Sequence, residues 1–198
     1  MEIGGENVQK IILASASPRR AELLKQIGIK FEVMVSDAKE EMLDLSPGEL
    51  AQNTAFQKAK LISRAGADSI IIAADTIVAV DGHKLGKPSD NKHAAEMLKM
   101  LSGRCHEVYT GLCVLEKPSG RYFLGHECTK VYFRELSQAE IEAYVSTGEP
   151  LDKAGAYGIQ GKGALLVEKI EGCYFNVVGL PLTLLYKTLK EFGIEILK

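Results

Sequence analysis

The chain has 198 residues, of which 46% are hydrophobic and 25% charged, so it can bury a core as one domain or two small lobes. Its 24 basic and 26 acidic residues give a formal net charge of -2, which provides no overall field to attract nucleic acid or an anionic membrane. The four cysteines lie far apart, without a C-x-x-C pair or a histidine at ligand spacing, which argues against a zinc site and a disulfide framework.

The N-terminal residues are polar and carry Glu2 and Glu6, unlike a signal peptide with a basic start and an apolar run. The longest apolar runs, near 69–74 and 177–185, are far shorter than the ~20 residues of a membrane span. We therefore expect a cytoplasmic protein that binds neither membrane nor nucleic acid.

The first half of the chain alternates short strands with helices. Ser17-Pro18 supplies an N-cap and a first-turn proline for a helix that runs to Gly28, and Ser46-Pro47-Gly48-Glu49 is a capping box that opens a helix toward Ala65. The other predicted elements are strands at 11–14 and 31–36, a buried strand at 70–72 that ends at Asp75, a hairpin over 77–85 and a helix at 90–101.

The second half is richer in strands. Two strand-like stretches between His106 and Phe133 flank a turn at 117–120, and a second capping box at 137–140 starts a helix that Gly148 ends. A glycine-rich loop over 155–163 then leads to a strand at 164–170 and a last helix that begins at Pro181. We predict an α/β protein with a mixed sheet, flanking helices and two lobes around a central cleft.

The segment from Ser15 to Arg20, with the sequence SASPRR, lies where a strand delivers the chain to a helix N-terminus. Helix N-terminal amides favour anions, and arginine binds phosphate oxygens through paired, charge-assisted hydrogen bonds. The segment lacks the P-loop pattern. It predicts a phosphate-binding turn, although a capped helix with solvated surface arginines has the same pattern.

Carboxylates and lysines follow at other loop positions. Asp75 comes after a buried apolar run, which places it at the carboxyl end of a strand, where ligands of α/β sheets bind. Glu40 and Glu41 follow the preceding strand in the same way. Lys60 lies in the long helix, and Lys87 lies in a loop between glycine and proline. Each has an ordinary alternative as a turn or surface residue. Together with the arginines, however, they have the composition of a triphosphate site with a bound metal.

Histidines and nucleophiles give no further site. The four histidines (His83, His93, His106 and His126) are scattered and are expected at the surface, and no serine or cysteine lies in a nucleophile-elbow context. We therefore expect no covalent mechanism. Gln160, flanked by glycines, is a candidate for contacting a nucleotide base.

Several blocks of the chain resemble the Maf family of nucleoside triphosphate pyrophosphatases. They run from Ile11 to about Leu182 and leave the first ten residues outside: LASASPRRAELL, the segment 37–40, AADTIV, LGKP, LSGRCHEVYTG, GEPLDKAGAYGIQG and NVVGLPL. The resemblance implies a single Maf/ITPase-like domain over 1–198 and a homodimer. It also implies hydrolysis between the α- and β-phosphates with Mg²⁺ or Mn²⁺, releasing pyrophosphate.

The same resemblance assigns roles to individual residues. It implies that Asp75 is the proton acceptor, which activates water or holds the metal that does so, and that Glu40 is the second carboxylate at the metal. The positions that contact phosphate are then Ser15, Arg20, Lys60 and Lys87. The subgroup that prefers dTTP and UTP is marked by an arginine, a threonine and a glutamine, which are here Arg19, Thr76 and Gln160.

Two other functions have to be weighed. A regulator of cell division or septum formation would bind a nucleotide in the same cleft without turnover, but such a sensor has no need of the Asp75 carboxylate. An RNA-binding protein would use a basic face around Arg19, Arg20, Lys58 and Lys60, and the balanced charge argues against it.

Overall fold

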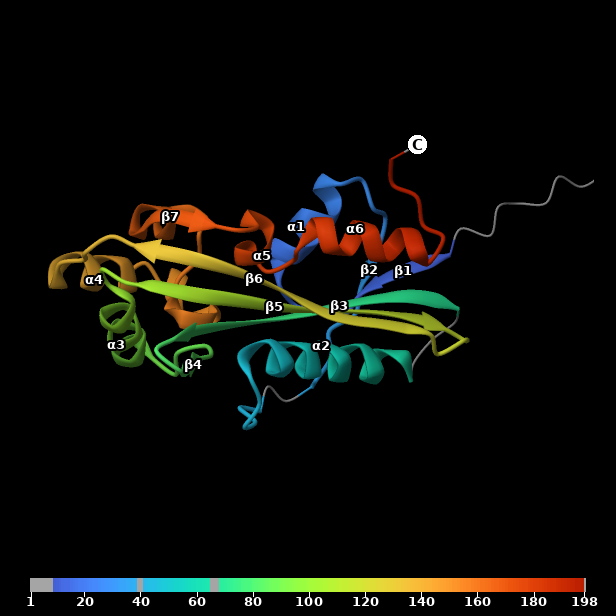
Figure 1. The fold of residues 1–198 in the computed structure, drawn as a ribbon, viewed down its shortest axis with the longest axis horizontal. Helices are drawn as coiled ribbons and strands as arrows, with labels where there is room; N and C mark the ends of the chain where they lie inside the picture. Colours follow the sequence, from blue (N-terminus) through green and yellow to red (C-terminus); the bar gives the residue numbers. More distant parts are fainter. Residues whose placement is uncertain (1–8, 39–40, 65–67, 198) are drawn as a thin grey trace, which may run out of the picture.

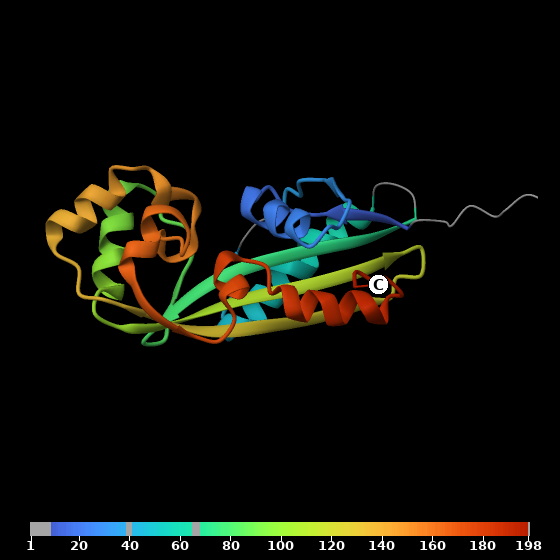
Figure 2. The same ribbon diagram turned by 90° about the horizontal axis from the view of Figure 1, so that it is seen from above.

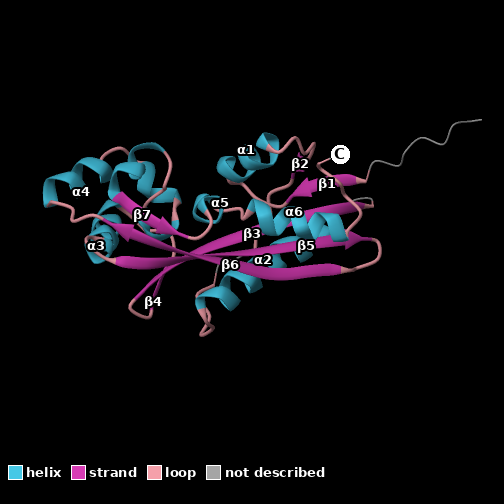
Figure 3. Cartoon of the chain, turned by 45° about the horizontal axis from the view of Figure 1, so that its top comes forward, coloured by secondary structure: helices cyan, strands magenta, loops and turns pink. Residues whose placement is uncertain are grey.

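The fold is a mixed sheet with helices on both faces, seen in a computed structural model that describes residues 9–38, 41–64 and 68–197 (Figure 3). Seven strands are described, in the order β2-β1-β3-β5-β6-β7 with β4 paired to β3; only the β1–β2 and β1–β3 pairs are parallel. The strands are β1 (Lys10–Leu13), β2 (Glu32–Val33), β3 (Ser69–Val80), β4 (His83–Leu85), β5 (Cys105–Lys117), β6 (Tyr122–Phe133) and β7 (Val167–Glu171). The predicted α/β class with a mixed sheet is confirmed.

The helices gather at the two ends of the long strands β3, β5 and β6 (Figures 1 and 2). They are α1 (Pro18–Gln26), α2 (Pro47–Ser63), α3 (Asn91–Leu101), α4 (Gln138–Val145), α5 (Tyr174–Val178) and α6 (Leu182–Glu191), with 3-10 turns η1 (Glu149–Asp152), η2 (Ala154–Ala156) and η3 (Gly161–Leu166). We call the end with α1, α2 and α6 the first lobe and the end with α3, α4 and the 3-10 turns the second lobe. No helix in the described part of the chain is both long and apolar enough to cross a membrane.

Each face of the sheet has its own apolar core. In the first lobe, Leu24 and Leu185 pack on one face, and Ala55 and Ala59 of α2 pack on the other. Around Leu98, a third cluster fills the second lobe. The helices therefore hold the strands from both sides.

Local sequence fixes where two helices begin. Both predicted capping boxes are confirmed, because Ser46 accepts from the Glu49 backbone N–H and Ser137 from that of Glu140, with the reciprocal bonds also present. Such a cap is worth about 1 kcal/mol. Ser17, predicted as an N-cap, makes no such side-chain bond; its own N–H donates to Ser15 Oγ at 3.2 Å.

The buried strand predicted to end at Asp75 instead continues to Val80, so that prediction was wrong. β3 pairs with β5 on both sides of this point, with Asp75 opposite Gly111 and Thr76 opposite Thr110. The backbone hydrogen bonds therefore go on where the apolar run stops. The change to polar side chains marks a change of surroundings and not the end of the strand.

Gly111 lets α2 lie directly against the sheet. A Cβ added at Gly111 would come 2.2 Å from the carbonyl carbon of Ala51, far inside any real contact. Because residues opposite each other on neighbouring strands point to the same face, the absent side chain leaves its space on the Asp75 side of the sheet. The helix occupies that space and comes within reach of Asp75.

His106 is only 2% exposed, so the expectation that all four histidines lie at the surface was wrong. It lies on β5 with its ring edge-on to those of Phe133 and Tyr157, at centroid distances of 4.9 and 5.3 Å. Its Nε2 is 2.7 Å from the Tyr157 hydroxyl. The alternation of β5 places His106 on the inward face with Val108, where apolar packing surrounds it.

The burial of His106 makes the free energy of unfolding depend on pH. Burial lowers the pKa of His106 from 6.5 to about 4, so folding favours the neutral imidazole. The associated stability is complete above pH 6.5 and is lost as the pH falls toward 4, because the unfolded chain takes up the proton first. A shift of this size is worth about 3 kcal/mol. We expect denaturant unfolding to show this loss in wild type and not in His106→Leu; parallel pH profiles would contradict it.

Candidate active site

A cavity of about 540 Å³ lies between the lobes, within the size range of small-molecule sites. β1 ends at Leu13 while its neighbour β3 runs on, so the turn that follows β1 lies beside the polar part of β3. The cavity is lined by the segments 14–20, 75–78, 86–87, 152–154, 157–160 and 177–179, by parts of α2, and by residues within 35–38 and 41–42. Segments far apart in the sequence thus converge on one site.

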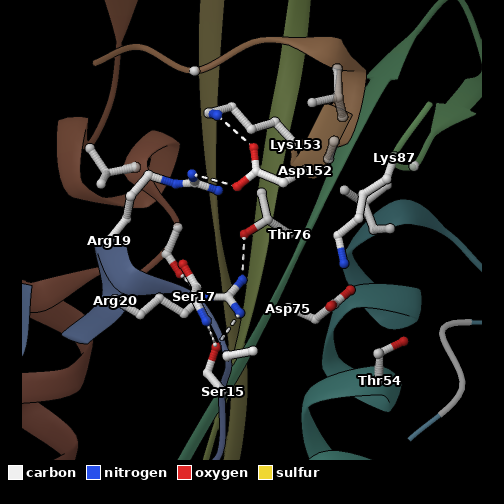
Figure 4. Close-up of a pocket in the computed structure, with 18 of the residues that line it drawn as sticks. Ser15, Ser17, Arg19, Arg20, Thr54, Asp75, Thr76, Lys87, Asp152 and Lys153 are labelled. Carbon is white, nitrogen blue, oxygen red and sulfur yellow. Dashed lines mark hydrogen bonds and ion pairs between the residues drawn. The ribbon is translucent and has the colours of Figure 1, made fainter. Parts of the chain in front are cut away.

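Arg20 is fixed in place before any ligand arrives. It is 9% exposed, and its guanidinium donates to the Gly179 carbonyl at 2.7 Å, to Ser15 Oγ at 3.1 Å and to Thr76 Oγ1 at 3.1 Å (Figure 4). Gly179 has a φ of 117°, a backbone conformation that favours glycine. The structure therefore presents a cation of defined orientation to the cavity.

Hydroxyl groups continue this network into the sheet. Thr110 donates to the Asn176 carbonyl at 2.9 Å, so in the 3.0 Å pair of threonine hydroxyls Thr76 is the donor and Thr110 the acceptor. Thr76 thereby accepts from Arg20 and donates to Thr110. Its hydroxyl orients the arginine, a role that its sequence position alone does not indicate.

Asp75 forms a buried ion pair with α2. Lys58 Nζ is 2.7 Å from Asp75 Oδ1, and the two side chains are 10% and 8% exposed. Lys87 extends from the loop after β4 and points toward Asp75 (Figure 4). One carboxylate and two ammonium groups from three elements therefore meet on the cavity wall.

A second ion pair crosses from one lobe to the other. Arg19 of α1 donates to Asp152 Oδ2 at 3.0 Å, and Lys153 donates to Asp152 Oδ1 at 2.6 Å (Figure 4). Asp152 is 59% exposed, so the pair is open to solvent and to competition from an anionic ligand. The predicted specificity residue Arg19 thus lies at the mouth of the cavity.

Gln160 lies in a loop that packs tightly against the second lobe. The Gly155 N–H donates to the Gly86 carbonyl at 3.1 Å, which ties this loop to the one that carries Lys87. A Cβ at Gly163 would come 2.1 Å from the Gly158 carbonyl oxygen, so only glycine fits there. Gln160 itself is half-buried on the cavity wall.

Most of the predicted site residues come together in this cavity. Its lining includes Ser15, Arg19, Arg20, Asp75, Thr76, Lys87 and Gln160. Lys60 does not line it: the side chain is exposed on α2, with Nζ 5.9 Å from the Phe56 ring centroid. Glu40 lies outside the described residues, whereas Glu41 lines the cavity.

Lys58 is a buried site residue that sequence reasoning did not place in the site. It lies four residues after Thr54 and three after Ala55, so helical spacing puts it on the buried face of α2. That periodicity was the available signal. A lysine on the apolar side of a helix needs a partner, and here the partner is Asp75.

The donor set fits a divalent cation shared with a phosphate ligand. Asp75 and Glu41 both line the cavity, but within the described ranges no three histidine, cysteine or carboxylate side chains converge as a complete ligand set. Mg²⁺ is usually held by one or two carboxylates together with substrate phosphates and water. The described residues match that arrangement.

Comparison with known proteins gives a consistent family. The model of the Maf-like proteins matches residues 10–192. A dTTP/UTP pyrophosphatase of Carboxydothermus hydrogenoformans is 56% identical over 93% of this chain and 99% of its own length. Proteins of the same name from Bacillus cereus and Desulforamulus reducens are 48% and 46% identical, over 97% and 96% of this chain and 94% and 100% of theirs.

A solved structure supports the fold alone. The Ham1 protein of Staphylococcus aureus superposes with a TM-score of 0.54 at 16% sequence identity, over 93% of this chain and 100% of that one. At this identity the likeness is one of architecture. It agrees with the mixed sheet and flanking helices described above.

Proposed function

This chain belongs to the Maf family, and we propose that it hydrolyses dTTP and UTP to the monophosphate and pyrophosphate. The observation that carries the proposal is the buried Asp75–Lys58 pair on the wall of the cavity that also holds Arg20. Relatives at 46% to 56% identity are named for this activity. The site thus combines a carboxylate for water with cations for phosphate.

We propose that the Asp75 carboxylate takes a proton from the attacking water. As the water oxygen bonds to the α-phosphorus, the bond from that phosphorus to the bridging oxygen breaks and pyrophosphate leaves with the electron pair. Lys58, paired at 2.7 Å, holds the carboxylate in position. Positioning and charge stabilisation make up most of what phosphoryl transfer requires of a protein.

The phosphates are proposed to lie between the two lobes. Arg20 and Lys87 supply positive charge from opposite sides of the cavity (Figure 4). Ser15 Oγ accepts from Arg20 and from the Ser17 N–H, which leaves its hydroxyl hydrogen for a phosphate oxygen. Lys60 stays a predicted phosphate contact. Lys58 is proposed as a further one, because it lies on the cavity wall.

The metal and the assembly are also proposals. Asp75 and Glu40 would hold Mg²⁺ or Mn²⁺ together with the phosphates, and the bound ion would offset charge on the leaving pyrophosphate. We also propose, from the sequence, that the chain forms a homodimer and lies in the cytoplasm.

Turnover is the experiment that tests the function. Purified protein with dTTP and Mg²⁺ is expected to release dTMP and pyrophosphate, separated by anion-exchange chromatography. A nucleotide-binding regulator would instead bind dTTP and leave it intact, and a product of dTDP with phosphate would place the cleavage at the wrong bond. The relatives named above are pyrophosphatases, and none of these findings favours the regulator.

Base preference gives a prediction for Gln160. Glutamine offers a donor and an acceptor to a pyrimidine edge, and an unpaired buried polar group costs about 1 to 3 kcal/mol. We therefore expect Gln160→Ala to lower the preference for dTTP over GTP by roughly 5- to 150-fold, measured as a ratio of kcat/KM values. Gln138→Ala, at an exposed position of α4, is the matched control. A uniform fall on both nucleotides would place Gln160 in catalysis instead.

A further inference from the structure

Residues 155–158, in the loop that leads to Gln160, make three hydrogen bonds to segments distant in the sequence. The Gly155 N–H donates to the Gly86 carbonyl at 3.1 Å, the Gly158 N–H donates to the Tyr144 hydroxyl at 3.3 Å, and the Tyr157 hydroxyl bonds to His106 Nε2 at 2.7 Å. The third bond is the shortest and is fully buried. It ties the loop to a side chain of the central sheet.

The backbone just before Tyr157 is in an unfavourable conformation. Gly155 and Ala156 have φ angles of 66° and 59°, and the left-handed region is costly for alanine because of its Cβ. Such a conformation persists only where the surrounding structure enforces it. The Tyr157 side chain, packed against the His106 and Phe133 rings, is the anchor that immediately follows.

A histidine at position 106 lowers the stability of the fold. Its Nδ1 is buried and has no hydrogen-bond partner among the described residues. An unpartnered buried polar atom destabilises the fold, and an apolar side chain of similar size would remove the penalty. The feature that an apolar side chain could not provide is the bond to Tyr157.

We propose that His106 is a positioning residue that sets the pyrimidine preference, by holding Tyr157 and hence the loop that presents Gln160 to the base. The inference rests on the proposed function, in which Gln160 reads the base. His106 itself contacts no substrate: it lies behind Tyr157, which lines the cavity. Its effect is therefore on where Gln160 lies and not on the attack at phosphorus.

Three variants test the bond at pH 8, where the histidine is neutral. Tyr157→Phe removes only the hydroxyl, His106→Leu removes the imidazole, and the double variant removes both. Each is expected to lower the kcat/KM preference for dTTP over GTP by about tenfold, with kcat on dTTP within about twofold of wild type. The double variant should lose no more than either single one, because all three break the same bond.

Stability and rescue separate this role from a merely structural one. The double variant replaces both polar partners by apolar groups, so its melting temperature should stay within about 3 °C of wild type or rise while its selectivity falls. His106→Gln can place an amide near the position of Nε2 and should recover part of the preference. Tyr132→Phe, whose hydroxyl bonds to Glu171 on the surface, is the matched control and should behave as wild type.

The experiments distinguish failure of the positioning role of His106 from failure of the proposed function. If Gln160→Ala loses selectivity while Tyr157→Phe and His106→Leu keep it, the positioning role is overturned and the proposed function stands. A fall in kcat on every nucleotide, or lost selectivity only where the protein melts early, also overturns it. If Gln160→Ala keeps full selectivity, the route through Gln160 is overturned, and absence of dTTP turnover in wild type overturns both.

Discussion

Asp75→Asn is expected to lower kcat on dTTP by roughly 10²- to 10⁴-fold, the range for removing a positioned general base. Asparagine keeps the size of the side chain but cannot take the proton from water. The change also removes the negative partner of the buried Lys58 ammonium, so some stability is lost as well. Initial rates should therefore be measured well below the melting temperature of the variant, with folding checked by circular dichroism.

Asp81→Asn is the matched control for this experiment. Asp81 is exposed in the hairpin turn between β3 and β4, where it pairs with Arg104, and its φ of 48° is one that asparagine tolerates. It should keep wild-type kinetics. Near wild-type turnover in folded Asp75→Asn would remove Asp75 from the proposed chemistry.

Lys58→Met is the second substitution for which we expect a large effect. Methionine preserves much of the unbranched apolar stem and removes the ammonium. The Asp75 carboxylate then loses its hydrogen bond of 2.7 Å to Lys58 while Lys87 still points toward it, so the free energy of unfolding should fall by about 1.5 to 3 kcal/mol. We expect kcat/KM on dTTP to fall by about 10²- to 10³-fold, as when one preorganised group is removed from a charged site.

Lys60→Met is the comparison that decides between the two lysines of α2. Lys60 is exposed and lies two residues further along the same helix, outside the cavity lining. Both variants should be measured with dTTP under the same conditions and unfolded in denaturant. A loss of activity in Lys60→Met with full activity in Lys58→Met would assign the phosphate contact to Lys60 and contradict the role given to Lys58.

The elements that could be predicted from sequence are those that local chemistry determines. The capping boxes at Ser46 and Ser137 start helices where expected, because the bonds involve residues three apart. Less local features were missed: α5 was not predicted, and residues 164–166, expected in a strand, lie in the 3-10 turn η3. Their conformation depends on packing against other elements.

The site also combines features that local sequence indicates with features that depend on packing. The turn after β1, predicted to bind phosphate, and Asp75 were both predicted to belong to the site, and both line the cavity. The bond from Arg19 to Asp152 joins residues 133 apart, and neither has a local pattern that names the other. Lys58 was missed because lysine is usually solvated, and the burial of its helix face depends on how closely α2 approaches the sheet.

The close approach of α2 to the sheet depends on Gly111, so this glycine determines the distance between Lys58 and Asp75 in the active site. A single added methyl group would collide with the α2 backbone and force the helix outward, carrying the Lys58 ammonium away from Asp75. The electrostatic energy of a charge pair falls as the separation grows and as water enters between the charges. Impaired catalysis in a position-111 variant would therefore report the tolerance of the helix-to-sheet gap, and would not mean that residue 111 meets the nucleotide.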